Sequence, residues 1–210
     1  MTNTQQGNQV SSSEQAIGIF DSGIGGLTVA NAVFDLLPQE QVIYYGDTAN
    51  IPYGSKPESV IRDFSFKITE FLLAKNCKAI VVACNTASAA ALDALRKHWP
   101  EIPFIGMEPA VKPAAKLTQT GKVGVLATAG TFKSQRYAKL METYAKDVVM
   151  IENSCVGLVK LIEQRKINHP ETQFLAPVYN LTIIPFVRWH KKRGIRWPDF
   201  KFFQFSKIGF

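Results

Sequence analysis

The strongest constraint on the fold of this chain is a repeated alternation of short apolar runs with segments of helical spacing. The apolar runs lie at 17–21, 42–46, 78–83, 103–106, 122–128 and 148–152. The segments of helical spacing lie at 27–38, 57–75, 86–98, 109–118, 132–145 and 155–165. Strands that are apolar throughout, rather than at every second residue, are typical of parallel sheets buried on both faces. The sequence therefore predicts an α/β fold of parallel sheets covered by helices.

Polar residues stand at or just beyond the ends of several predicted strands. Asp21, Asp47, Cys84 and Thr128 each occupy such a position. In parallel α/β sheets, ligands bind beyond the carboxyl ends of the strands. We therefore expect these four side chains to share one edge of the fold and to contribute to a site.

The first of these positions opens a glycine-rich turn, residues 21–26, with the sequence DSGIGG. It lacks the lysine of a P-loop, and its glycines are misspaced for the dinucleotide-binding fingerprint. One interpretation is that its backbone amides approach a small anion, with Asp21 and Ser22 projecting into the site. The other is an ordinary strand-to-helix turn, in which Asp21 or Ser22 caps the helix.

Cys84 lies where a buried strand meets a helix, in the stretch VVACNTASAA. The first turn of a helix presents unpaired N–H groups and the positive end of the helix dipole, and both favour thiolate over thiol. On this interpretation Cys84 has the lowest pKa of the thiols. The alternative is that Cys84 is only a small buried hydrophobe, the commoner role of a free cysteine.

Composition excludes several classes of protein. The three cysteines suit neither a disulfide framework nor a zinc site, and the three histidines are scattered, so we expect no metal. No apolar run approaches the roughly 20 residues of a membrane helix. Residues 1–16 lack the basic start and apolar middle of a signal peptide, and we expect a disordered leader. These features favour a cytoplasmic protein without a membrane partner.

The composition changes abruptly in the last part of the chain. Residues 178–210 hold seven of the 24 basic residues, nine of the 23 aromatic residues and a single acidic residue, Asp199. A shifted reading frame or a premature end of the coding sequence would produce such a segment. The rival interpretation is a tail that binds nucleic acid or a membrane surface. Because the segment has no helical or alternating period, we expect it to be poorly ordered.

Five motifs together resemble glutamate racemases, of the aspartate/glutamate racemase superfamily. The resemblance runs from about residue 17 to about residue 172 and departs after about residue 175. The motifs, in order, are Asp21-Ser22-Gly23 with Gly25-Gly26, Tyr45-Gly46-Asp47, Pro52-Tyr53-Gly54, Val82-Ala83-Cys84-Asn85-Thr86-Ala87-Ser88, and Gly124-Val125-Leu126-Ala127-Thr128 with Gly130-Thr131.

The resemblance implies two similar α/β lobes with the site between them. Here residues 17–106 would be the first lobe and 107–177 a second, truncated lobe, so that the C-terminal part of the fold is incomplete. It also implies interconversion of L- and D-glutamate without a cofactor or metal, to supply D-glutamate for peptidoglycan. The expected partner is the small-molecule substrate glutamate, and the resemblance is compatible with a homodimer.

The resemblance also assigns roles to residues. Two cysteines flank the α-carbon of the substrate, one as base and the other as acid, and Cys84 would be the first of them, assisted by Asp21. The expected substrate-binding residues are Asp21, Ser22, Pro52, Tyr53, Gly54, Asn85, Thr86 and Thr131.

The second cysteine of the family, in a Cys-Thr-His motif expected beyond residue 175, is absent from these 210 residues. Cys77 lies across a strand from Cys84, roughly 23 Å away at 3.3 Å per residue. Cys155 follows a predicted strand and could reach the active edge, although a structural role suits it better. We therefore expect little or no racemisation by this chain. The alternatives are an inactive glutamate-binding protein and, less favoured, a nucleic-acid binder that uses the basic tail.

Overall fold

The computed structural model describes residues 15–154 together with 157, 161, 164 and 166, which fall within one unit of the chain. Most of the expected leader 1–16, the helix over 155–165 and the segment 178–210 lie outside the described residues, apart from isolated positions. The leader was predicted to end too late, because Ala16 is buried and begins the first strand. Within the described part, the α/β fold with parallel sheets and helices is confirmed.

The first sheet has four strands in the order β2-β1-β3-β4, and every neighbouring pair is parallel. The strands are β1 (Ala16–Asp21), β2 (Val42–Gly46), β3 (Cys77–Val82) and β4 (Phe104–Gly106). The helices that connect them are α1 (Leu27–Leu36), α2 (Glu58–Ala74) and α3 (Asn85–His98). Two short 3₁₀ turns, η1 (Thr48–Asn50) and η2 (Tyr53–Ser55), precede α2.

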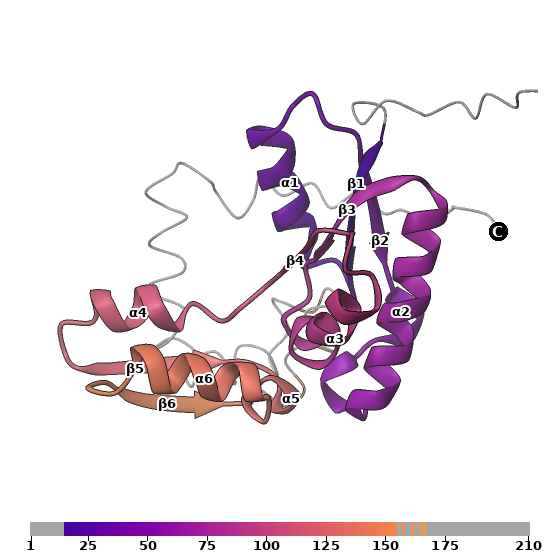
Figure 1. Cartoon of the computed structure of the whole chain (residues 1–210). Coiled ribbons are helices and arrows are strands. Elements are labelled where there is room, and N and C mark those ends of the chain that lie inside the picture. Colours follow the sequence, from indigo (N-terminus) through magenta and orange to yellow (C-terminus); the bar gives the residue numbers. More distant parts are fainter. Residues whose placement is uncertain (1–14, 155–156, 158–160, 162–163, 165, 167–210) are drawn as a thin grey trace, which may run out of the picture. The chain divides into compact units, whose positions relative to one another are not determined.

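Helices cover both faces of this sheet (Figure 1). Phe20 and Val82 pack in a cluster with residues of α2 and α3, whereas Ile19 and Val81 pack against α1. Successive side chains of a strand point to opposite faces, so neighbours in β1 and β3 join different clusters. The two-sided burial explains why these strands are apolar at consecutive positions.

The second sheet pairs β5 (Lys122–Leu126) with β6 (Val149–Asn153) in parallel. Val111, at the start of α4 (Val111–Leu117), packs with Tyr137 and Ala145 in a third cluster that includes side chains of this sheet. Val149 and Ile151 are 57% and 59% exposed. Among the described residues, then, the expectation of a sheet covered on both faces is met by the first sheet and not by the second.

The helix predicted over 132–145 is α6 (Gln135–Tyr144), and a short helix that was not predicted, α5 (Ala129–Phe132), precedes it. Ser134 ends one and starts the other: its Oγ donates to the carbonyl of Thr131 at 2.7 Å and accepts the N–H of Tyr137 at 3.2 Å. A serine that caps a helix in this way competes with continuation of the preceding turn.

The described residues contain no helix long and apolar enough to cross a membrane.

Close packing at Gly26 gives a test of this fold. A Cβ added at Gly26 would lie 2.7 Å from the Asp21 Cβ and 3.0 Å from the Ala83 Cβ, which are both fixed on strand ends. We expect Gly26→Ala to lower the free energy of unfolding by about 1–3 kcal/mol, measured by urea denaturation. Gly25→Ala is the control, since its nearest neighbour would be the Asp21 Oδ2 at 3.4 Å. Equal effects of the two variants would contradict the packing described.

Candidate active site

Asp21 closes the glycine-rich turn with its own carboxylate. It is the last residue of β1 and is buried. Its Oδ1 accepts the N–H of Ser22 at 2.7 Å, and its Oδ2 accepts the N–H of Gly26 at 2.6 Å. Two of the amides that could have met a small anion are therefore already paired. At these two positions the interpretation as a strand-to-helix turn describes the structure better.

Cys84 is the N-cap of α3 and is buried. Its Sγ accepts the N–H of Ala87 at 3.4 Å and lies 3.4 Å from the Oγ of Ser22. The chain places it there because an apolar run at the end of β3 continues to Ala83 and the helix begins at Asn85. Asp21, Ser22 and Cys84 thus form one connected group at the carboxyl ends of two adjacent strands.

The pKa of Cys84 is raised to about 11. Burial is the largest cause and the negative charge of Asp21 is the second, while hydrogen bonds from Ser22 and Ala87 lower the pKa by less. The expectation that the helix start makes this a low-pKa thiol is therefore wrong. Loss of hydration outweighs the few N–H groups that face the sulfur. Burial also raises the pKa of Cys77, at the opposite end of β3.

Asp47 organises the segment that contains Tyr53. The Tyr53 hydroxyl donates to the Asp47 Oδ2 at 2.6 Å, and the Asn50 side-chain amide donates to the Oδ1 at 2.9 Å. The N–H of Asp47 donates to the carbonyl of Asp21 at 2.9 Å, which ties this segment to β1. The Tyr53 ring is buried in the core, and burial and Asp47 raise the pKa of its hydroxyl. Pro52, before it, is exposed.

A chain of threonine hydroxyls links α3 to α5. The Oγ1 atoms of Thr86 and Thr128 are 3.0 Å apart, and those of Thr128 and Thr131 are 3.1 Å apart. Gly54 packs directly on this chain, since a Cβ there would lie 2.6 Å from the Thr128 Cγ2. Asn85, beside Thr86, is exposed.

An open cavity of about 370 Å³ lies next to the threonine chain. Its walls include Gly54, Thr86 and Gly130, together with the lysines Lys56 and Lys133. The predicted site residues therefore fall into two groups: one around Cys84, and one around Thr128 beside this cavity. The position of Thr128 after a strand predicted that it would contribute to a site, although it is not among the expected substrate-binding residues.

In the part of the chain that the structure describes, no group of three or more histidine, cysteine or acidic side chains could hold a metal ion.

Comparison with known proteins identifies the family. The family described as Asp/Glu/hydantoin racemase matches residues 27–180. The chain belongs to this racemase family. A glutamate racemase of Ectopseudomonas mendocina is 48% identical over 167 residues, which are 80% of this chain and 64% of that protein. The match therefore spans less than two thirds of the length of such relatives.

Solved structures of glutamate racemases share the fold. One from Bacillus anthracis has a TM-score of 0.68 at 38% identity, covering 79% of this chain and 64% of that one. The enzyme from Escherichia coli, in complex with L-glutamate and the activator UDP-MurNAc-ala, has a TM-score of 0.68 at 34% identity, covering 83% of this chain and 65% of that one.

The raised pKa of Cys84 leads to a prediction for thiol chemistry. Alkylation of Cys84 by iodoacetamide should be slow at neutral pH and should accelerate up to about pH 11, because only the thiolate reacts. We expect Asp21→Asn to lower the pKa of Cys84 and to speed alkylation at pH 8 by roughly 3- to 10-fold, since one pKa unit is a tenfold change in thiolate. Peptide mapping by mass spectrometry measures both cysteines.

Cys77 is the internal control for this measurement, because burial alone raises its pKa. Its alkylation rate should be the same in the Asp21→Asn variant as in the unmodified sequence. Faster alkylation of both cysteines would indicate a loosened fold, and an unchanged rate at Cys84 would contradict the electrostatic role of Asp21. Urea unfolding of the same variant measures the stability that is lost because an Asn side chain has one acceptor oxygen and can accept only one of the two N–H groups that Asp21 accepts.

Proposed function

We propose that this chain carries the substrate-binding residues and one proton-transfer group of a glutamate racemase. The proposal rests on the residues that meet at the carboxyl ends of β1 and β3. There the Cys84 Sγ lies 3.4 Å from the Ser22 Oγ, and the charge of Asp21 raises the pKa of Cys84. A thiol at that edge, beside a carboxylate, can take a proton from carbon or return one. The membership in the racemase family gives this chemistry its substrate class.

The protonation state of Cys84 would depend on the substrate. With its pKa raised to about 11, the thiol of Cys84 holds its proton at pH 7. Glutamate brings an α-ammonium group, and a cation near Asp21 would offset the negative charge that raises the pKa. Substrate binding would therefore make Cys84 a better base at the moment when a base is needed, and it would act as an acid in the reverse direction.

The remaining polar groups suit a ligand with two carboxylates. Hydroxyls and backbone N–H groups of small residues can bind carboxylates without bringing a full positive charge. The residues proposed to bind glutamate are Asp21, Ser22, Pro52, Tyr53, Gly54, Asn85, Thr86 and Thr131. The hydroxyl link from Thr86 to Thr128 supports a site between two lobes, 17–106 and 107–177, because it joins residues of both.

The same geometry supports the proposal that these 210 residues do not racemise glutamate on their own. Inversion by proton transfer needs an acid and a base on opposite faces of the α-carbon, and a missing partner typically loses about 10²- to 10⁴-fold. Cys77 is buried at the far end of β3, and Cys155 lies outside the described residues. An inactive glutamate-binding protein is therefore the second candidate. For the glutamate racemase as a whole, the same proposal includes a cytoplasmic location, the supply of D-glutamate for peptidoglycan and a homodimer.

Deuterium exchange separates these outcomes. We expect the chain, incubated in D₂O with L- or D-glutamate, to introduce deuterium at the α-carbon of one enantiomer only and to leave its configuration unchanged. A single thiol can remove and return a proton on one face, whereas inversion needs a second group. Mass spectrometry measures the deuterium, and chiral chromatography measures the configuration. Cys84→Ser is the control and should abolish the exchange.

Each other result has a defined meaning. Inversion of either enantiomer would contradict the proposal that this chain lacks a second proton-transfer group. Binding of glutamate in calorimetry without any exchange would favour the inactive glutamate-binding protein. Neither binding nor exchange would contradict the proposed function as a whole.

A further inference from the structure

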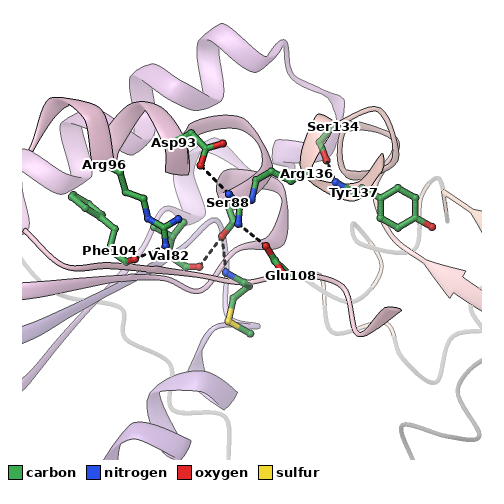
Figure 2. Close-up of polar contacts among 10 residues, drawn as sticks. Val82, Ser88, Asp93, Arg96, Phe104, Glu108, Ser134, Arg136 and Tyr137 are labelled. Carbon is green, nitrogen blue, oxygen red and sulfur yellow. Dashed lines mark hydrogen bonds and ion pairs between the residues drawn. The ribbon is translucent and has the colours of Figure 1, made fainter. Parts of the chain in front are cut away.

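The connection between the two sheets is anchored on α3. The Oγ of Ser88 donates to the carbonyl of Val82 at 3.0 Å and accepts the N–H of Met107 at 2.9 Å. The Arg96 guanidinium donates to the carbonyl of Phe104 at 2.8 Å. Figure 2 shows these contacts side by side, between α3 and the strand end that leaves the first sheet. The backbone from β4 to Met107 is therefore held at two points by one helix.

Arg136 on α6 bridges to the same region. Its Nη1 lies 2.9 Å from the Asp93 Oδ1 on α3, and its Nη2 lies 2.6 Å from the Glu108 Oε1, just after Met107 (Figure 2). The Arg136 side chain is only 23% exposed. One planar guanidinium, with donors pointing in fixed directions, thus joins three segments of the chain.

Stability is not the main effect to expect from these ion pairs. Asp93 and Glu108 are exposed, and ion pairs with exposed carboxylates contribute little to the free energy of folding. Two simultaneous contacts from one rigid guanidinium instead restrict how α6 can shift along α3. The threonine chain crosses between the same two parts of the fold. Thr86 lies in the first turn of α3, whereas Thr128 caps α5 and Thr131 lies within it, directly before α6.

We propose that Arg136 is a positioning residue of the candidate site. Through Asp93 and Glu108 it holds α6 on α3, and it thereby sets Thr128 and Thr131 against Thr86. Its importance for glutamate binding rests on the proposed function, whereas its effect on the alignment of α5 and α3 does not.

Nuclear magnetic resonance on the full chain tests the alignment without any ligand. In Arg136→Met we expect the amide signals of Gly54 and Thr86 to shift, because both residues contact Thr128 and neither is near Arg136 in sequence. Lys139→Met is the matched control: it also removes a cation from α6, and the structure gives Lys139 no ion pair among the described residues. Those two signals should stay in place in the control. Arg136→Lys, which can meet one carboxylate at a time, should give an intermediate shift.

Glutamate affinity gives the second measurement. Arg136→Met should weaken binding by about fivefold or more, as expected for a coupling between two sites, while Lys139→Met should leave it unchanged. Unshifted Gly54 and Thr86 signals in Arg136→Met would overturn the proposal, and so would a general loss of amide protection through β1–β4, which would indicate a structural role. If the unmodified sequence binds no glutamate, the proposed function fails and the ligand-free signals still decide the role of Arg136.

Discussion

The buried carboxylate of Asp21 is the interaction on which the rest of the candidate site depends. It accepts the N–H groups of Ser22 and Gly26, and its own carbonyl accepts the N–H of Asp47. The turn after β1 and the segment after β2 are therefore fixed by the same residue. Burying a carboxylate without these N–H donors would cost free energy of folding. The charge of Asp21 therefore depends on the glycine-rich turn that supplies the donors, and the turn depends on the carboxylate that accepts them.

The same charge sets the chemistry of Cys84. A helix start favours a thiolate, but burial and a neighbouring carboxylate oppose it, and here the opposing effects are larger. The result is a thiol whose pKa is well above its ordinary value. In the proposed function, a cation of the ligand placed near Asp21 would offset this effect and favour the thiolate.

The sequence was sufficient for those parts of the fold that depend on local pattern. The consecutive apolar residues of β1 and β3 predicted a parallel sheet, and the polar residues after them were correctly expected to lie at one edge of it. The short helix α5 was not predicted, and the helix expected from residue 132 begins at Gln135, because a single hydroxyl, that of Ser134, caps α6. The pairing of Tyr53 with Asp47 and the raised pKa of Cys84 could not be predicted, because both depend on burial created by distant segments.

Helix α3 brings the site and the junction between the sheets into one rigid element. Cys84 caps it, Thr86 lies in its first turn, Ser88 follows half a turn later, and Asp93 lies further along the same helix. Because a helix fixes the positions of its residues relative to one another, a contact made at Asp93 is transmitted to Thr86 and Cys84 without an intermediate. The residues that resemble the racemase motif therefore occupy the start of α3. Asp93, which pairs with Arg136 of α6, lies further along the same helix. The residues at the start of α3 are in this way held in a fixed position relative to α5 and α6, which follow some forty residues later in the chain.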